Sequence, residues 1–468
     1  MEDVFFPSVS IITVNFNGAR FLPGLFTSIS NLDYPAEKIE VIMVDNNSSD
    51  KSCDIVAQMF PSVKIINLSS NMGYAQGNNA GFAAAKGQYF ALLNNDCTVD
   101  RQWLSGLVKT ILEEGRISKA GAAGSKVLFF YSYILLEFET GGQTLCIKDF
   151  YINNGQKSGR MGVCSLEENL CKSIRFIRNC SPSSRKKDGT VTSWSLNDGA
   201  VLALPLADKE SSLELCLEVS DNSNISGISV NIKNPGDADK KIRIYQSNIN
   251  ESGPKIKISI PEKYNVLKAS LVNSCGLEIN NSFYARDRGG DTIDEGQFDK
   301  RAEIFAPSGS SLLVSRKMLE ETGYFAKSFF TYYEDMDLFW RARLKGWKVF
   351  FSPDSVARHH HCGTGVEWSP SFTYYVLRNR LVAIFRCGWC SLFARAYFDF
   401  IAAAVLAIAG CAKEFLRGKR CNRPDIAIRL RIIFGFFYIL PKDIISRLKI
   451  RSSKKVPDSQ IKKWAISF

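Results

Sequence analysis

The sequence contains little histidine and no long apolar run. Its 468 residues include only three histidines, and these are consecutive at positions 359–361. The longest apolar run, residues 400–412, is shorter than the roughly 18 residues that a membrane-spanning helix needs. We therefore expect no spanning helix. This segment should either lie on a membrane surface or form a buried helical hairpin.

The N-terminus also lacks the basic region and apolar stretch of a secretory signal. A cytosolic start is therefore expected, and the 13 cysteines should be thiols in a reducing compartment. The predicted localisation is cytoplasmic, with peripheral attachment to the cytoplasmic face of the cell membrane.

Positive charge is concentrated near the C-terminus. Lysine and arginine outnumber aspartate and glutamate by 59 to 47 over the whole chain, and by 13 to three between residues 413 and 455. Such a segment favours an anionic partner, either a membrane surface or nucleic acid. Because the apolar stretches 400–412 and 432–440 accompany it, we predict an anionic membrane surface and no nucleic acid.

Two common nucleotide-binding signatures are absent. No Gly-x-Gly-x-x-Gly follows the first apolar strand and no Gly-x-x-x-x-Gly-Lys-Ser/Thr occurs, so a dinucleotide site or a P-loop loses its main support. Apolar strand patterns at 9–14, 41–44 and 90–93 instead alternate with helical patterns at 19–30 and 73–86. This alternation predicts an α/β fold, in which helices cover both faces of a mostly parallel sheet.

The pattern changes after Gly142. Up to Cys275 the chain is rich in Ser, Asn, Lys and Gly, with alternating runs such as 213–219 and 256–260. A period of two is typical of strands with one face in a core and one in water. We predict an inserted all-β, sandwich-like module over residues 143–275. Helical patterns then resume at 315–322, 334–345 and 371–385.

Polar residues follow three of the predicted strands. Asn15 closes the first, Asp45 closes the second, and Asn94, Asn95 and Asp96 follow the third. Ligands of open α/β sheets bind beyond the carboxyl ends of the strands, although Asn and Asp there are also common turn formers and helix caps. Carboxylates at such an edge suit a nucleotide whose phosphates are bridged by a divalent cation.

A second group of acids opens a predicted helix. Glu334, Asp335 and Asp337 lie within four residues, where acids are favoured by the helix dipole. A carboxylate there can also act as a general base for an attacking hydroxyl. The three histidines could complete a Mg²⁺ or Mn²⁺ site beside a carboxylate. A structural zinc site fits less well, because neighbouring residues of a strand point to opposite faces.

Together these segments resemble the bacterial family 2 glycosyltransferases, especially the rhamnosyltransferase-like branch with a GT-A (nucleotide-diphospho-sugar transferase) fold. The resemblance covers residues 7–142 and 276–390. Six motifs carry it in order: Val14-Asn15-Phe16-Asn17-Gly18, Val44-Asp45-Asn46-Asn47-Ser48-Ser49-Asp50, Asn71-Met72-Gly73-Tyr74-Ala75-Gln76-Gly77-Asn78-Asn79, Leu92-Leu93-Asn94-Asn95-Asp96, Tyr333-Glu334-Asp335-Met336-Asp337-Leu338 with Trp340-Arg341-Ala342-Arg343, and Arg358-His359-His360-His361.

The resemblance implies a role for each motif. Asp96 would be the metal ligand, in a motif where asparagine replaces the first acid of the family's Asp-x-Asp, and His359 would approach the metal and diphosphate. Glu334 and Asp335 would be the catalytic acids, with Asp335 as the base. The nucleotide sugar would be bound by Val14, Asn15, Phe16, Asp45, Asn47, Gly73, Asn78, Asn94 and Asn95.

The implied activity is an inverting sugar transfer that depends on Mg²⁺ or Mn²⁺. The donor would be dTDP- or UDP-linked, with rhamnose as the first expectation, and the acceptor a lipid-linked glycan or a polysaccharide. The alternative is a non-catalytic glycan-binding or scaffold protein that retains the fold.

The resemblance also divides the chain into four parts. Residues 1–142 would be the nucleotide-binding half of the GT-A domain, 143–275 the β module, 276–390 the acceptor and catalytic half, and 391–468 a helical, basic, membrane-surface region. The β module could bind acceptor glycan, mediate self-association or contact with a partner enzyme, or be a tolerated insertion.

Overall fold

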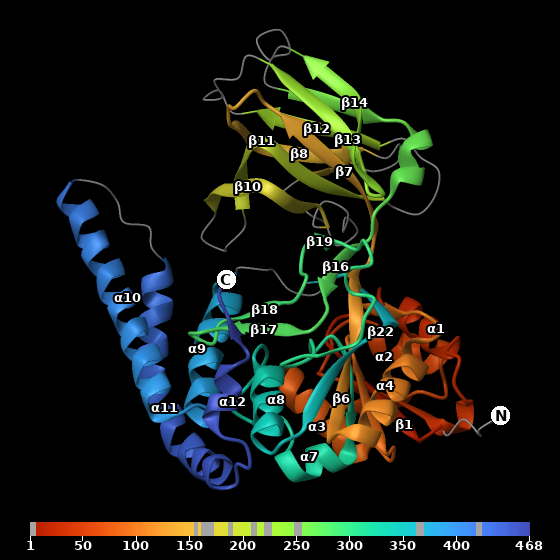
Figure 1. Cartoon of the computed structure of the whole chain (residues 1–468), viewed down its shortest axis with the longest axis vertical. Helices are drawn as coiled ribbons and strands as arrows, with labels where there is room; N and C mark the ends of the chain where they lie inside the picture. The colour runs from red at the N-terminus through yellow and green to blue at the C-terminus, as the bar shows by residue number, and fades with distance from the viewer. Residues whose placement is uncertain are drawn as a thin grey trace.

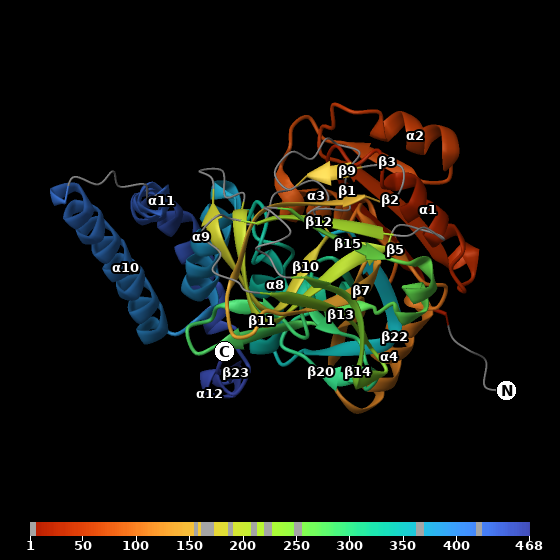
Figure 2. The ribbon, with the colours of Figure 1, turned by 90° about the horizontal axis from the view of Figure 1, so that it is seen from above.

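The computed structural model describes residues 6–153, 158–160, 173–185, 191–206, 213–219, 227–247, 255–361, 369–417 and 424–468. Figure 1 shows an α/β body, a second sheet above it and a pair of long helices at one side. The same helical pair projects to that side when the molecule is viewed from above (Figure 2).

The α/β body is built on an 11-stranded sheet with the order β19-β16-β6-β21-β4-β1-β2-β3. β22 also pairs with β6, and β20 and β5 pair with β22. Its strands are β1 (Val9–Asn15), β2 (Ile39–Asp45), β3 (Lys64–Asn67), β4 (Tyr89–Leu93), β5 (Cys97–Val99), β6 (Ala120–Phe129), β16 (Leu271–Ser274), β19 (Thr292–Ile293), β20 (Ala302–Glu303), β21 (Ser311–Ser315) and β22 (Lys348–His359).

Parallel pairing holds in the N-terminal part of this sheet. β3, β2, β1 and β4 are parallel neighbours, and β22 is parallel to β6. β21, however, runs antiparallel to both β4 and β6. The sheet is thus mixed, because strands from the second half of the chain enter between and beside those of the first. The predicted α/β fold class is confirmed, with its additional β-rich region and C-terminal helices. The expectation of a mostly parallel sheet is wrong, because most strands from the second half of the chain pair antiparallel with their neighbours.

Helices cover both faces of the sheet, as its apolar strands require. On β1, Ile12 packs into one core with Phe82, while its neighbour Ile11 packs into another with Trp103. The helices of this body are α1 (Leu22–Ser30), α2 (Ser52–Met59), α3 (Gly73–Ala84), α4 (Trp103–Ile117), α7 (Arg316–Thr322) and α8 (Glu334–Leu344), with a short 3₁₀ helix at Ala36–Lys38.

The second sheet has nine antiparallel strands in the order β14-β13-β7-β11-β8-β12-β15, with β10 on β11 and β9 on β8. They are β7 (Ser132–Glu139), β8 (Leu145–Asn153), β9 (Ser158–Arg160), β10 (Arg175–Arg185), β11 (Val191–Leu206), β12 (Leu213–Val219), β13 (Ile228–Asn234), β14 (Asp237–Ser247) and β15 (Lys255–Ile260), followed by a 3₁₀ helix at Glu262–Leu267.

This sheet curls around its own apolar core. The strands at the two ends of its order, β14 and β15, contact each other, and the core is formed by residues such as Leu136, Leu215 and Ile258. Its first strand, β7, precedes the boundary predicted at residue 143, while β16 belongs to the α/β sheet. Two chain segments join the bodies, and Tyr133 on the outgoing one pairs with Ala269 on the returning one.

The C-terminal helices are α9 (Pro370–Cys387), α10 (Cys390–Leu416), α11 (Pro424–Ser452) and α12 (Asp458–Lys462), beside a small sheet of β17 (Leu277–Asn280), β18 (Ala285–Asp287) and β23 (Ala465–Ile466). Among the described residues, α10 alone is long and apolar enough to cross a membrane by length and composition. A helix of this length and composition was not anticipated, because the prediction considered only uninterrupted apolar runs. These two properties do not distinguish a spanning helix from one on a surface.

The cysteines agree with the expectation of thiols at most described positions. Eight of them are free. Cys411, near the end of α10, is disulfide-bonded, which contradicts the expectation there. A cross-link requires two sulfurs to approach closely in space, and nothing in the spacing of these cysteines indicates such an approach.

Candidate functional site

Three strand ends meet at one edge of the α/β sheet. Asn15 ends β1 and donates from Nδ2 to Oδ1 of Asp45, which ends β2, at 3.0 Å. Asn95, after β4, donates from Nδ2 to Oδ1 of Asn15 at 2.9 Å. These two hydrogen bonds join the predicted strand-end residues in one row. All three side chains are buried.

Asp45 is also the anchor of the loop that follows β2. Its carboxylate accepts hydrogen bonds from the Ser48 backbone N–H at 2.8 Å and from the Ser48 hydroxyl at 2.6 Å. Asn47 lies in this loop at φ 64°, a left-handed conformation that asparagine tolerates better than most residues. These contacts are the turn-forming role that such residues commonly play. Together with the hydrogen bond from Asn15, they occupy most of the acceptor capacity of this carboxylate.

The other residues predicted to bind nucleotide lie around this row. Val14 is half-buried and Phe16 is exposed. Gly73, with φ +78°, begins α3 and packs so tightly that an added Cβ would lie 2.2 Å from the Phe330 carbonyl oxygen. Asn78 is buried and donates to the Tyr74 carbonyl of its own helix. Gly73 and Asn78 therefore have structural roles in the described contacts.

The predicted metal ligands lie side by side. Asp96 follows β4 and His359 ends β22, and Oδ1 of Asp96 is 3.1 Å from Nε2 of His359. Both are buried, and Asn94 lies beside them, with Nδ2 at 3.5 Å from Nε2 of His359. The ring Nδ1 of His359 faces Oδ1 of Asn273 at 2.9 Å. With Nδ1 directed to Asn273, Nε2 is the ring nitrogen available to a metal ion beside Asp96.

A carboxylate oxygen is a suitable ligand for both Mn²⁺ and Mg²⁺, and an imidazole nitrogen is a suitable ligand for Mn²⁺. Cys97 is the third member of this buried cluster of metal-ligand side chains. Burial raises the pKa of the Cys97 thiol well above its usual value, and its sulfur faces the Ser310 carbonyl. The residues present thus fit a hard divalent cation held by Asp96 and His359 better than a thiolate-bound metal.

The three histidines do not converge on one point. The His360 ring stacks on Phe130, with centroids 3.6 Å apart, and burial lowers the pKa of His360 to about 4. His361, at φ 52°, lies on the side of His359, with the two ring centroids 5.7 Å apart and its Nδ1 3.3 Å from Nδ2 of Asn273. His360 thus faces away from its two neighbours, as alternation along a strand predicts.

The acids at the start of α8 follow a constrained loop. Tyr332 and Tyr333 have φ of 67° and 66°, a conformation that costs energy for residues with a Cβ. Asn379 on α9 holds this loop by donating from Nδ2 to the Thr331 and Tyr332 carbonyls, both at 2.8 Å. The loop and α9 together determine where the first turn of α8 begins.

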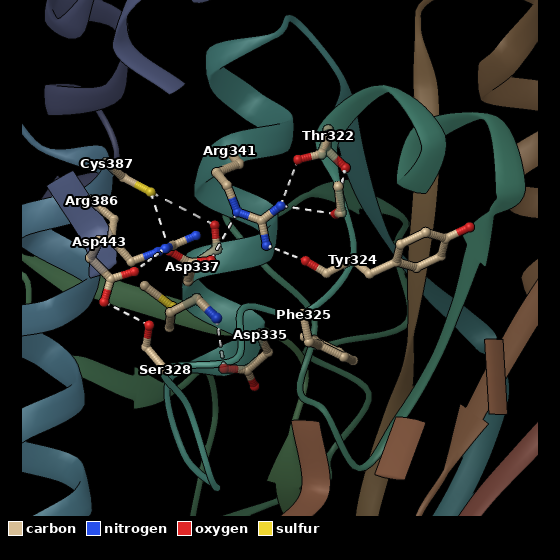
Figure 3. Close-up of polar contacts among 12 residues, drawn as sticks. Thr322, Tyr324, Phe325, Ser328, Asp335, Asp337, Arg341, Arg386, Cys387 and Asp443 are labelled. Carbon is tan, nitrogen blue, oxygen red and sulfur yellow. Dashed lines mark hydrogen bonds and ion pairs between the residues drawn. The ribbon is translucent and has the colours of Figure 1, made fainter. Parts of the chain in front are cut away.

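Asp335 faces away from the buried cations of α8 (Figure 3). Its Oδ2 accepts from the Gly309 backbone N–H at 3.1 Å, and its Oδ1 from that of Met336 at 2.7 Å. Burial raises the pKa of Asp335 to about 6, although these two N–H groups oppose the shift. Burial and the neighbouring Asp335 charge raise the pKa of Glu334 well above its usual value, and Oε2 of Glu334 has no hydrogen-bond partner within the described structure.

Asp337 has a different environment. Its carboxylate pairs with Arg341 at 2.8 Å and with Arg386 at 2.7 Å. Burial alone would raise its pKa, but the two guanidinium groups outweigh burial and lower it. Arg386 also pairs with Asp443 of α11, so that α8, α9 and α11 are joined by one chain of buried charges (Figure 3).

Sequence reasoning missed the residues that orient these groups. Asn273 contacts His359 from a strand that follows the β module, and Gly309 contacts Asp335 through its backbone N–H. Tyr74 donates to the Gly309 carbonyl. A backbone donor carries no sequence signal. Asn273 stood inside a segment assigned to the inserted module, so nothing indicated its position beside a histidine.

Comparison with known proteins identifies the N-terminal part. Residues 10–162 match the model of Glycosyl transferase family 2. The chain carries a family 2 glycosyltransferase domain. The matched stretch is less than half of the chain, and it contains Asn15, Asp45 and Asp96 but not Asp335 or His359.

Individual relatives match over stretches of similar length. Glycosyltransferase AglE of Haloferax volcanii is 30% identical over 128 residues, covering 27% of this chain and 41% of its own length. A GalNAc(5)-diNAcBac-PP-undecaprenol beta-1,3-glucosyltransferase of Campylobacter jejuni is 27% identical over 140 residues, covering 29% and 43%. The chain thus spans less than half the length of these relatives.

One solved structure that resembles this chain is a mannosyltransferase of Pyrobaculum calidifontis in complex with GDP-Man and Mn²⁺. The alignment covers 92% of this chain and 86% of that chain, at 13% identity and a TM-score of 0.39. This overall likeness is remote.

Proposed function

We propose that the protein is an inverting, metal-dependent glycosyltransferase that moves a sugar from a nucleoside diphosphate to an acceptor hydroxyl. The observation that carries the proposal is the contact of Asp96 with His359, whose Oδ1 and Nε2 atoms are 3.1 Å apart. The contact lies at the carboxyl edge of the α/β sheet, whose first strands are largely within the stretch that matches family 2. Asp335, a half-buried acid without a cation partner among its described contacts, supplies the second requirement, a base.

In this mechanism Asp335 accepts the proton of the acceptor hydroxyl as its oxygen attacks the anomeric carbon from the side opposite the diphosphate. A pKa of about 6 leaves this carboxylate ionised at neutral pH and still basic enough to take the proton. The N–H groups of Gly309 and Met336 hold it in place. Asp96 and His359 would hold Mg²⁺ or Mn²⁺, which neutralises charge on the departing diphosphate.

The classes of donor and acceptor are inferred from the family resemblance and from the name of one relative. The resemblance to the rhamnosyltransferase-like branch favours a dTDP- or UDP-linked donor, with rhamnose as the first sugar to test. A lipid-linked glycan is the favoured acceptor class, since the Campylobacter relative is named for a PP-undecaprenol-linked glycan. A polysaccharide is the second class.

The C-terminal helices support attachment to an anionic membrane surface. α10 exposes Phe398, Leu406 and Phe415, with 68%, 72% and 74% of their surfaces accessible, and α11 exposes Phe434 and Tyr438 at 64% and 83%. Basic residues accompany these side chains, and each cation near an anionic surface contributes about 1 kcal/mol. A soluble partner does not need this combination of exposed aromatic and basic side chains, whereas a lipid interface favours it.

The activity is tested by a donor screen that measures release of nucleoside diphosphate, with Mg²⁺ or Mn²⁺ and with EDTA. Wild type should react with one donor, and both EDTA and Asp335→Asn should abolish the signal. Asp354→Asn, at an exposed position of β22, is the matched control and should retain activity. If nucleotides and metal raise the melting temperature but no donor reacts even with lipid and glycan acceptors, the non-catalytic glycan-binding alternative is favoured.

Membrane attachment is tested by sedimentation with vesicles. The protein should bind vesicles that contain phosphatidylglycerol and not those of phosphatidylcholine alone, and Leu406→Glu should weaken binding. High salt or alkaline carbonate should release a peripheral protein. Resistance to both would indicate that α10 spans the bilayer, and absence of binding would contradict the membrane proposal.

A further inference from the structure

The connections of the β module contact the histidine segment at the metal-binding end of β22. On the outgoing side, Phe129 lies against His361 with ring centroids 5.6 Å apart, and Phe130 stacks on His360. On the returning side, Asn273 contacts both His359 and His361. Both connections therefore reach the segment that carries the proposed metal ligand.

Asn273 is placed by an irregularity in its strand. In the pairing of β16 with β6, Val272 is opposite Leu128 and Ser274 is opposite Val127, so Asn273 is an extra residue between them. Such a bulge changes the direction of a side chain, and bulges are common beside active sites. Here the bulge accompanies a buried side chain, 6% exposed, that meets two imidazole rings.

The amide has one acceptor and one donor end, and each faces a different ring. Its Oδ1 is 2.9 Å from Nδ1 of His359, and its Nδ2 is 3.3 Å from Nδ1 of His361. Because an amide oxygen only accepts, this orientation of the amide places the hydrogen of a neutral His359 on Nδ1 and its lone pair on Nε2. That lone pair faces the Asp96 carboxylate at 3.1 Å, which is repulsive without a cation, so this tautomer is the metal-binding form of the pair.

The geometry points to Asn273 as a positioning residue of the metal site: we propose that it fixes the tautomer and ring orientation of His359, so that Nε2 is presented to the divalent cation beside Asp96. This inference rests on the proposed metal site. Outer hydrogen-bond partners of a metal-bound histidine commonly contribute 10–100-fold in metal affinity. The strand that follows the inserted module, β16, thereby contributes to the metal-binding end of the α/β sheet.

The first test measures Mn²⁺ binding to the full chain by electron paramagnetic resonance of the free ion, with and without UDP or dTDP. Asn273→Leu should weaken Mn²⁺ binding by about 10–100-fold. Asn273→Asp keeps the acceptor for His359 and should bind within about threefold of wild type or more tightly, since a carboxylate partner raises ligand basicity. Asn231→Ala removes a buried amide from β13 of the module and should leave binding unchanged.

The second test reads the tautomer directly. Because the chain has three histidines, a ¹⁵N-histidine spectrum contains only three imidazole rings. His359, assigned through His359→Gln, should be in the Nδ1–H form in wild type and in Asn273→Asp when both are loaded with diamagnetic Mg²⁺. In Asn273→Leu its two ring nitrogens should shift toward a mixture of tautomers. This readout does not depend on turnover. If Asn273→Leu acted only through a general loss of packing, Asn273→Asp would not restore the wild-type tautomer.

Two results would contradict the inference in distinguishable ways. If wild type and Asp96→Asn bind Mn²⁺ equally, the metal site of the proposed function is wrong and the inference falls with it. If Asp96→Asn loses Mn²⁺ while folded Asn273→Leu keeps it within about threefold, or if His359 has Nε2–H in Mg²⁺-loaded wild type, the metal site stands and the role of Asn273 is overturned.

Discussion

Asp335 and Asp337 lie two residues apart on the first turn of α8, yet they have opposite environments. Asp335 meets only backbone N–H groups in its described hydrogen bonds, and burial raises its pKa to about 6. Asp337 is fully buried between Arg341 and Arg386, which together lower its pKa despite that burial. One turn of helix thus carries an acid suited to proton transfer and an acid suited to holding three helices together.

The difference shows that a cluster of acids in a sequence does not have a single function. The helix turns by about 100° per residue, so residues two apart face nearly opposite directions. Asp335 faces the loop at Gly309, whereas Asp337 faces α9 and, through Arg386, Asp443 of α11. The partners on each side, which come from distant parts of the chain, decide the chemistry of each carboxylate.

The largest expected effect comes from breaking the Asp337 side. Asp337→Asn leaves Arg386 and Arg341 buried with fewer anionic partners, and removal of one member of a buried ion pair typically costs about 3–5 kcal/mol. The free energy of unfolding, measured by urea denaturation, should fall by that amount. Asp335→Asn should not lower it, because Asp335 is an acid whose ionised form burial disfavours. Equal losses in the two variants would contradict the assigned difference.

A smaller effect is expected from Gly73, which packs against the loop leading to Asp335. Gly73→Ala introduces a Cβ 2.2 Å from the Phe330 carbonyl oxygen at φ +78°. Unfavourable backbone conformations of this kind cost about 1–3 kcal/mol, and the displaced loop should also reduce turnover. Stability and nucleoside diphosphate release are both measured.

The control for Gly73 is another helical glycine. Gly115→Ala in α4 meets nothing within 4 Å, and should stabilise the protein by about 0.5–1 kcal/mol. If Gly73→Ala is also stabilising, the contact between α3 and the loop before Asp335 is not tight.

The pH dependence of turnover separates the two acids further. A general base must be ionised, so activity should be present above about pH 6 and should fall as the pH drops through the raised pKa of Asp335. Well below that pKa, kcat should fall by about tenfold per pH unit. Asp337, with its lowered pKa, should add no limb near pH 6. A kcat that stays constant down to pH 4.5 would exclude Asp335 as the base.

Much of the fold follows from the sequence because its signals are local. Uninterrupted apolar strands such as 9–14 require cover on both faces, and they form β1 within two packed cores. The strand ends at Asn15, Asp45 and Asp96 could likewise be anticipated, since ligand sites lie at that edge in α/β sheets. The start of the second sheet was less predictable, because the apolar β7 has the same character as a strand of the α/β body.

The orientation of the site could not be predicted, because it depends on contacts between distant segments. Asn273 reaches His359 from a bulge after the β module, and the bulge depends on pairing with β6. Gly309 acts through a backbone N–H that every non-proline residue carries. The contrast between Asp335 and Asp337 likewise depends on arginines and loops that come together only in the folded chain.

The central claim is that Asp335 accepts the proton in sugar transfer, and a paired measurement of donor binding and turnover in Asp335→Asn tests it most directly. Once the reacting donor is identified, its dissociation constant in the presence of Mn²⁺ should remain within about threefold of wild type, while kcat falls by about 10²–10⁴. Turnover within tenfold of wild type in the folded variant would show that another group accepts the proton, and would contradict this account.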